Sequence, residues 1–249
     1  MTQIFPFTLG PSLGQRAKLG LVVLQSDETI EHDFRRLVPE SGVSLFVSRI
    51  PSAPEVTSDT LAQMEALMPD AAGRLPRPIG FDTVGYGCTS GTSVIGAQKV
   101  ADLVREGCAT RAVTEPVSAL IAACEALEIS NLALLSPYLP DVSEGLRRVL
   151  KAAGIATPVF GTFNEAEETR VARIDGESLL AAGRTLAAQG GAQAVFLSCT
   201  NLRTLDIIAR LEDETGLPVL SSNQVLAWHM LRLSGITDAI PGYGRLLTL

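Results

Sequence analysis

The sequence predicts an α/β protein made of two similar halves, each a Rossmann-like lobe with a mainly parallel four-stranded sheet. The composition is 46% hydrophobic but only 5% aromatic, and small aliphatic residues are typical of buried parallel strands and the helices that cover them. Short apolar runs alternate with amphipathic stretches along all 249 residues, which favours βα units. The order of these elements then repeats once.

Eight short apolar runs are the expected strands, and segments with a helical pattern lie between them. The clearest helices are VSALIAACEAL and QVLAWHMLRL, where apolar residues recur at the spacing i, i+3, i+4. In chain order, the strands are expected at residues 19–24, 43–50, 82–88, 110–114, 131–136, 155–161, 194–199 and 217–221.

The repeat has a nearly constant spacing. Leu19 in the first half pairs with Leu132 in the second at a shift of 113 residues, and Gly42 pairs with Gly154 at a shift of 112. The last strands of the two halves pair at a slightly smaller shift. Features that recur in the same order at one spacing predict two halves related by a pseudo-two-fold axis.

A Cys-Thr pair closes one strand in each half, at Cys88 and Cys199, 111 residues apart. Ligands of open α/β sheets bind at the carboxyl ends of the strands, so we expect both cysteines to face an active site in the cleft between the lobes. The first lobe is predicted to span residues 1–120 plus 226–249, and the second residues 121–225.

Composition also limits the partners. The net charge of −7 and the scattered basic residues argue against nucleic acid, and no apolar run is long enough for a membrane span. With only His32 and His229 as histidines, no metal site is expected. Four cysteines without a Cys-x-x-Cys pair, and no signal peptide, predict reduced thiols and a cytoplasmic location. We expect a small carboxylate substrate, no cofactor, and a homo-oligomer, either a dimer or a tetramer.

The chemistry is expected at Cys88 and Cys199. A thiolate is a strong nucleophile, a thiol is a proton donor of useful acidity, and a helix N-terminus lowers a thiol pKa. Hydroxyl or amide residues follow each cysteine where a helix is expected to begin, and their backbone N–H groups can hold a substrate carboxylate. These residues are Thr89 and Ser90 in the first half, and Thr200 and Asn201 in the second.

A plainer interpretation exists for each of these residues. A cysteine is often only a small buried hydrophobe, which is what we expect of Cys108 and Cys124. The threonines can serve simply as helix N-caps. For Cys88 and Cys199 the repeat favours a catalytic role. A planar carbon has two faces, and a duplicated half can present one sulfur to each face.

The motifs GYGCTSGTSVIG, LSCTNLRTLD, LPVLSSNQVLAWHMLRLSG and PGYGRLL resemble those of the aspartate/glutamate racemase superfamily, in the branch of maleate cis–trans isomerases and arylmalonate decarboxylases. The resemblance implies a cofactor-independent enzyme with two pseudo-symmetric lobes. Because the decarboxylases keep only the second cysteine, the presence of both favours an isomerase or racemase. The resemblance also implies that Tyr138 and Asn164 contact the substrate, although Tyr138 can be an ordinary loop residue and Asn164 a helix cap.

One position departs from the maleate isomerase pattern. Where those enzymes carry an asparagine that holds a substrate carboxylate, this chain has Asp27 in QSDETIEHD. A carboxylate there repels a second substrate carboxylate and attracts an ammonium or amide N–H group, unless Asp27 only caps the following helix. The same stretch resembles the racemase-like group of ectoine utilisation, which would suggest a diaminobutyrate-type substrate.

These observations predict an isomerase that acts on a small carboxylate through two cysteines, and they favour a racemase of an amino acid or N-acyl amino acid. One alternative is a maleate cis–trans isomerase, in which a thiolate adds to the double bond and leaves after the C–C bond rotates. Another is a non-catalytic protein that binds small acids. A thiol hydrolase that pairs Cys88 with His32 or His229 is less favoured, because neither histidine lies in a recognisable nucleophile–base motif.

Overall fold

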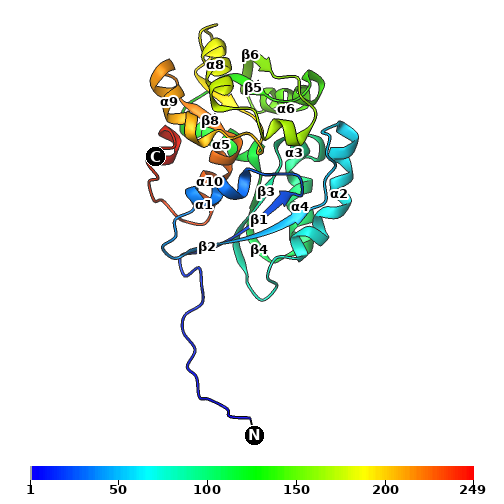
Figure 1. Cartoon of the computed structure of the whole chain (residues 1–249), viewed down its shortest axis with the longest axis vertical. Helices are drawn as coiled ribbons and strands as arrows, with labels where there is room; N and C mark the ends of the chain where they lie inside the picture. Colours follow the sequence, from blue (N-terminus) through cyan, green and yellow to red (C-terminus); the bar gives the residue numbers. More distant parts are fainter. Residues whose placement is uncertain (1) are drawn as a thin grey trace.

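The computed structural model describes residues 2–249 and contains two four-stranded parallel sheets (Figure 1). Their strand orders are β2-β1-β3-β4 and β6-β5-β7-β8, so each strand of one sheet has a counterpart at the same place in the other. The predicted fold class is confirmed, and every predicted strand is present with its ends within two residues. The strands are β1 Ala17–Leu24, β2 Val43–Ile50, β3 Phe81–Gly87, β4 Thr110–Thr114, β5 Asn131–Ser136, β6 Ala156–Thr162, β7 Ala194–Leu197 and β8 Val219–Ser221.

Helices cover both faces of each sheet, which is why the central strands are continuous apolar runs. In Figure 1, α1 and α10 lie on one side of the first sheet and α2 and α4 on the other, while α6 and α8 lie on opposite sides of the second. The helices are α1 Ile30–Leu37, α2 Ser58–Gly73, α3 Thr89–Ile95, α4 Ala97–Gly107, α5 Pro116–Ala126, α6 Pro140–Ala152, α7 Glu168–Val171, α8 Gly176–Ala187, α9 Leu205–Thr215 and α10 Ser222–Leu233, followed by the 3₁₀ helix η1 Arg245–Thr248.

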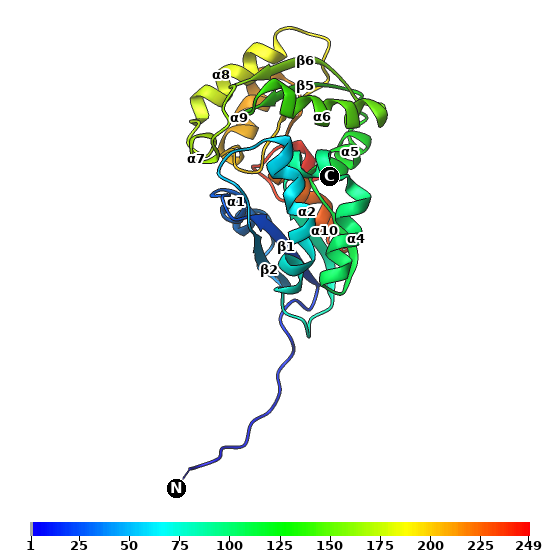
Figure 2. The ribbon, with the colours of Figure 1, turned by 90° about the vertical axis from the view of Figure 1, so that its right-hand side faces the viewer.

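Helix α10 joins the two halves. It begins directly after β8 of the second sheet, with Ser221 and Gln224 forming a capping box, and then packs on β3, β4, α1 and α5. Figure 2 shows it in the middle of the molecule. The predicted division of the chain into lobes stays a prediction, and its boundaries at 120/121 and 225/226 fall inside α5 and α10.

The backbone itself repeats. Gly42, just before β2, has φ +77°, and its predicted counterpart Gly154, just before β6, has φ +83°. Both residues adopt the left-handed conformation that glycine reaches without steric cost. The pairing inferred from the sequence therefore corresponds to the same turn in both halves.

The halves differ after their cysteines. Helix α3 begins at Thr89, directly after Cys88, as expected, but α9 begins only at Leu205. The expectation of a helix immediately after Cys199 is therefore wrong. Cys199 has a positive φ of 145°, which is incompatible with entry into a right-handed helix, and Asn201 uses its side chain to bind neighbouring segments instead.

The N-terminal segment, residues 2–14, runs away from both sheets in Figures 1 and 2. It lies outside helices and strands, and its apolar side chains Ile4, Phe5, Phe7 and Leu9 are largely exposed. Among the helices in residues 2–249, none is both long and apolar enough to cross a membrane.

Replacing Gly42 or Gly154 with alanine tests the repeated turn. Each substitution should lower the free energy of unfolding by about 1 kcal/mol, because a Cβ atom is disfavoured at positive φ. Gly42→Ala should cost more, because its Cβ would lie 2.9 Å from the Arg16 side chain, while the site of Gly154 is open. Chemical denaturation measures the difference. Gly10→Ala is the control, and a Gly154→Ala protein as stable as the control would contradict the argument.

Candidate active site

The carboxyl ends of β3 and β7 meet at a small cavity between the two sheets. Cys88 directly follows β3, Cys199 follows β7 after one residue, and the two are only 5% and 4% exposed. The cavity measures about 10 Å³, roughly the space for one water molecule, so binding of a small acid requires the surrounding side chains to move. Its walls come from both halves: Leu24, Val56, Leu61, Cys88, Thr89, Ser90, Tyr138, Glu168, Cys199 and Thr200.

Cys88 is the N-cap of α3. Its Sγ accepts a hydrogen bond from the backbone N–H of Gly91 at 3.1 Å, an arrangement that favours a thiolate. Glycine is required at position 91, because a Cβ atom there would lie 2.7 Å from the Tyr86 hydroxyl and 2.9 Å from the Cys88 sulfur. Tyr86 is completely buried behind this sulfur. The first sulfur is therefore fixed by one backbone donor and a tightly packed wall.

Cys199 is held in a different way. Its positive φ is rare for a residue other than glycine, and such a conformation costs about 1–3 kcal/mol unless its surroundings impose it. Here its N–H donates to Ser222 Oγ at 3.0 Å, and its Sγ accepts from the Asn201 N–H at 3.2 Å. The Tyr138 hydroxyl lies 3.0 Å from the sulfur. These contacts hold the second sulfur toward the cavity.

Ser222, the first residue of α10, links the two cysteine segments. Its Oγ accepts the Cys199 N–H and also a hydrogen bond from the Thr89 hydroxyl at 2.8 Å. Thr89 directly follows Cys88, so one side chain fixes the backbone on both sides of the cavity. Sequence analysis missed Ser222, because a serine at a helix start is explained by capping alone.

The cavity also contains a carboxyl group that sequence analysis missed. Glu168, the first residue of α7, is 2% exposed and lines the cavity. The Tyr138 hydroxyl donates to its Oε1 at 2.5 Å, and the Asn201 side-chain amide donates to its Oε2 at 2.6 Å. Because both oxygens accept from donors, the hydrogen bonds favour the ionised carboxylate. Glu168 lies in the charged run NEAEETR, where the sequence does not distinguish it from Glu165 or Glu167.

Burial dominates the electrostatics of the site. It raises the pKa of Cys88 to about 12 and the pKa of Cys199 well above its usual range. The negative charge of Glu168 raises the pKa of both thiols further. Burial also raises the pKa of Glu168 itself, against the opposing effect of its hydrogen bonds from Tyr138 and Asn201. In the closed cavity, every added negative charge is therefore costly.

The two sulfurs are nevertheless not equivalent. Cys199 is linked to Glu168 through the Tyr138 hydroxyl, which bonds both of them. With that hydroxyl donating to the carboxylate, the remaining hydrogen bond to Tyr138 runs from the Cys199 S–H group, so this sulfur keeps its proton. Cys88 accepts from a helix N-terminus instead. Of the two buried sulfurs, Cys88 therefore has the hydrogen bond that favours a thiolate, while burial holds the pKa of both thiols high.

The structure brings together most of the predicted site residues. Thr89, Ser90, Tyr138 and Thr200 line the cavity with the two cysteines. Asn201 lies behind the wall, where it holds Glu168 and accepts the backbone N–H of Glu28. Asn164 does not lie at the cavity. Its backbone is left-handed with φ +56°, its side chain is exposed, and its N–H donates to Thr162 Oγ1. In this structure Asn164 therefore forms part of a turn and does not line the cavity.

Asp27 is buried behind the cavity and is not among its lining residues. Its Oδ1 accepts the N–H groups of Thr29 and Ile30, both at 2.8 Å, which is the capping role considered from the sequence. Its Oδ2, however, is buried and has no hydrogen-bond partner in residues 2–249. Asp27 is close enough for its charge to raise the pKa of both cysteines and of Glu168.

The histidines lie away from the sulfurs. His229 is on α10, with Nδ1 2.8 Å from the Thr114 hydroxyl, and His32 is an exposed residue of α1. Neither forms a hydrogen bond with a cysteine within the described residues, so the geometry does not support a thiol hydrolase. Within the same residues, no group of three or more His, Cys, Asp or Glu side chains is arranged to hold a metal ion.

Two parallel four-stranded sheets with one buried cysteine at the carboxyl edge of each define a class of cysteine-dependent α/β enzymes. The sequence profile of the family described as Arylmalonate decarboxylase matches residues 65–247, and the chain belongs to this family. It is a cysteine-dependent, isomerase-like enzyme.

Named relatives agree with this assignment. The maleate isomerase of Nocardia farcinica is 28% identical over 92% of this chain and 95% of its own. The arylmalonate decarboxylase of Bordetella bronchiseptica is 32% identical over 52% of this chain and 55% of its own. A solved structure of the Nocardia farcinica enzyme, a cysteine-to-serine mutant with a covalently bound succinylcysteine intermediate, superposes with a TM-score of 0.84 at 26% identity, covering 93% of this chain and 98% of that one.

Glu168→Gln should lower the pKa of Cys199, because it removes the nearest negative charge while an amide oxygen still accepts from Tyr138. The pH dependence of thiol alkylation, measured in a background with Cys108→Ser and Cys124→Ser, reports this shift. The curve should move to lower pH for Glu168→Gln and stay in place for Glu167→Gln, its exposed neighbour. Identical curves for the two variants would show that Glu168 does not control the thiol.

Proposed function

We propose that this chain is a two-cysteine racemase or isomerase whose substrate carries both a carboxylate and a nitrogen, as an amino acid or N-acyl amino acid does. The observation that carries the proposal is the lining of the cavity between the sulfurs. This lining includes the carboxyl group of Glu168, which accepts from two donors, and among the described residues it includes no Arg, Lys or His side chain. Such a lining favours a substrate with one positive or N–H-bearing group and disfavours a substrate with a second negative charge.

Asp27 strengthens the preference for nitrogen. It and Glu168 are both buried, burial raises the pKa of each carboxyl group, and the charge of Asp27 raises the pKa of Glu168 further. An ammonium group in the cavity would compensate both charges, while a dicarboxylate would add two more. Among the described residues, Oδ2 of Asp27 has no hydrogen-bond partner, and a substrate N–H donor would satisfy it once the cavity wall in front of Asp27 moves.

The hydroxyl-bearing residues of the cavity are the proposed binding site for the single carboxylate of the substrate. Ser90 and Thr200 line the cavity with hydroxyl groups, and Ser90 belongs to the first turn of α3, where backbone N–H groups point outward. A carboxylate held there would place its α-carbon near both sulfurs.

For an amino acid, the two sulfurs then act from opposite faces. The Cys88 thiolate takes the α-proton, so that the Cα–H bond breaks and an S–H bond forms. The Cys199 thiol gives its proton to the other face of the same carbon, so that its S–H bond breaks and a new Cα–H bond forms. The product is the mirror image, and each sulfur has exchanged its protonation state with the other.

Maleate isomerisation is the second candidate, favoured by the likeness to the Nocardia farcinica enzyme. In that case the Cys88 thiolate adds to the double bond, the C–C bond rotates, and the thiolate leaves. A non-catalytic binding protein would not need two sulfurs facing one cavity. We also propose a cytoplasmic homo-oligomer, supported by the four free cysteines and by the exposed apolar N-terminal segment.

Cysteine replacement tests the two-sided mechanism. Cys88→Ser and Cys199→Ser should each lower turnover by orders of magnitude, because neither sulfur can reach the face served by the other. Cys108→Ser and Cys124→Ser, away from the cavity, should have little effect. The assay is proton–deuterium exchange at the α-carbon across a panel of small amino and acylamino acids. Near-normal turnover by either single variant would rule the mechanism out, and exchange by one variant in one stereochemical direction would identify the face of each sulfur.

Removal of the two buried charges distinguishes the substrates. Asp27→Asn and Glu168→Gln should each weaken the binding of an amino or acylamino acid by about ten- to a hundredfold, the contribution of a charge-assisted hydrogen bond to affinity. Both should increase maleate isomerisation, because the repulsion of the second carboxylate is relieved. Fumarate formation and amino acid turnover are measured on the same preparations, with Glu167→Gln as the control. A wild-type enzyme that already isomerises maleate efficiently, with no gain in either variant, would show that the protein is a maleate isomerase.

A further inference from the structure

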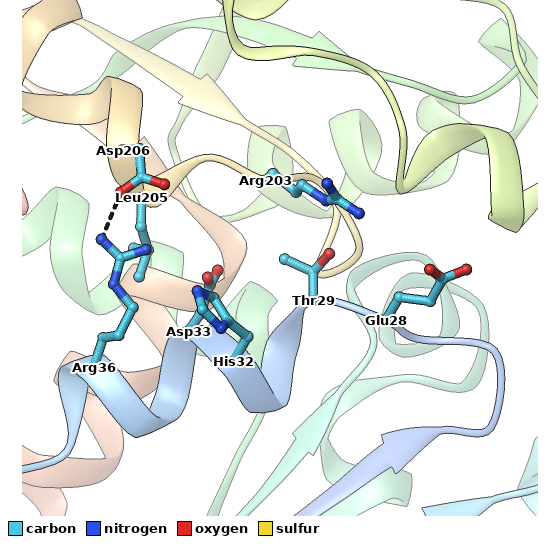
Figure 3. Close-up of a pocket in the computed structure, with 8 residues that line it drawn as sticks. All are labelled: Glu28, Thr29, His32, Asp33, Arg36, Arg203, Leu205 and Asp206. Carbon is cyan, nitrogen blue, oxygen red and sulfur yellow. Dashed lines mark hydrogen bonds and ion pairs between the residues drawn. The ribbon is translucent and has the colours of Figure 1, made fainter.

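We propose that a second cavity, between α1 and the segment that leads into α9, binds a small zwitterionic amino acid and is coupled to the Cys199 segment. The cavity measures about 380 Å³ and shares no lining residue with the cysteine site. Figure 3 shows its walls: helix α1 below, and the Arg203–Asp206 segment above. The lining residues are Glu28, Thr29, His32, Asp33, Arg36, Arg203, Leu205 and Asp206.

The cavity presents charges of both signs that are not matched within the protein. Arg203 extends over Thr29 in Figure 3, and within residues 2–249 its guanidinium forms no hydrogen bond or ion pair with another residue. Glu28 likewise has no ion pair in that range. By contrast, Arg36 and Asp206 neutralise each other at 2.5 Å and close one end of the cavity. One cation and one anion are thus left available to a ligand.

Asp33 supplies a second, buried acceptor. Its side chain is 2% exposed and lines the cavity, and its Oδ2 accepts from the Asn223 side-chain amide at 2.8 Å. Its Oδ1 has no hydrogen bond within the described residues. Burial raises the pKa of Asp33 to about 7, and a bound ammonium would favour its ionised form. A nearly buried carboxyl group with one unsatisfied oxygen is suited to a donor that arrives with the ligand.

The mixture of charges selects the ligand class. A simple anion that binds Arg203 would lie beside Glu28 and Asp33, and a simple cation at Asp33 would lie beside Arg36 and Arg203. A zwitterion avoids both repulsions, because its carboxylate can pair with Arg203 while its ammonium pairs with Asp33 or with Glu28, which lie on either side of Thr29 in Figure 3. A free amino acid is the smallest common molecule with both groups, and the cavity has room for its side chain.

The second cavity is connected to the cysteine site through hydrogen bonds. The Asn223 amide that donates to Asp33 also donates to the Thr200 carbonyl at 2.7 Å, and the Thr29 hydroxyl donates to the Asn201 carbonyl at 2.9 Å. Thr200 and Asn201 directly follow Cys199. We infer that a ligand on Asp33 perturbs the Asn223 contact with the segment that positions the second sulfur, and by linkage the occupancy of one site then changes the affinity of the other.

Three matched probes test the ligand class: L-alanine, propionate, which lacks the ammonium, and ethylamine, which lacks the carboxylate. Saturation-transfer NMR on the full chain should show binding of L-alanine that is about ten- to a hundredfold weaker for Arg203→Gln. Glu28→Gln should weaken it less, because Asp33 still accepts the ammonium. Arg148→Gln, the same change on exposed α6, should leave it unchanged, and both single-charge probes should bind more weakly than L-alanine.

Glu168→Gln separates this site from the cysteine site. Alanine binding that Arg203→Gln removes and Glu168→Gln preserves belongs to the second cavity, whether or not the cysteine site accepts amino acids. Alanine binding that is equal in wild type and Arg203→Gln, or propionate binding as tight as that of L-alanine, would overturn the proposal. So would alkylation of Cys199 at the same rate with and without saturating L-alanine, because coupling requires a change at that sulfur.

Discussion

The buried carboxylate of Glu168 is the constraint on which the cysteine site depends. It is fixed by Tyr138 and Asn201, and both of these residues also contact Cys199. The same small group of contacts therefore positions a negative charge, a hydroxyl and a sulfur together. Since a buried charge without donors is strongly unfavourable, the positions of Tyr138 and Asn201 are as tightly specified as those of the cysteines. The N–H from Asn201 and the strained backbone of Cys199 follow from this requirement.

Duplication accounts for the symmetric part of the site and not for the rest. The two sheets, the left-handed glycines before β2 and β6, and a cysteine at the end of the third strand of each half all repeat. Glu168 and Tyr138 belong to connections of the second half only, and Ser222 belongs to the helix that returns to the first. The repeat thus places two sulfurs on either side of one cavity, and the residues that do not repeat make them chemically different.

The same division explains what the sequence could predict. Strands and repeat were predictable because buried parallel strands impose apolar runs at regular spacing, as in β5 and β7, and the cysteines because a repeat marks them. Glu168 was not, because its burial arises from the packing of α7 against the cavity, and one glutamate among several in a charged run looks exposed. Asn164 does not line the cavity as it stands, so its contact with the substrate stays a prediction, since a polar residue in a loop carries no signal of its direction. The helix expected after Cys199 failed because a positive φ leaves no trace in the sequence.

The inequality of the sulfurs also bears on the choice between the two reactions. When the Cys88 thiolate adds to a double bond and later leaves, both sulfurs return to their starting protonation states. A permanent difference in pKa between the two thiols therefore does not slow repeated turnover. Racemisation instead leaves Cys88 protonated and Cys199 as a thiolate next to Glu168, the arrangement that the cavity disfavours. A substrate ammonium removes this difficulty, because its positive charge offsets Glu168 for as long as the substrate or its mirror image is bound. In a racemase built on this site, the asymmetry of the cavity therefore favours a substrate with an ammonium group, and among the proposed substrates it favours a free amino acid over an N-acyl amino acid.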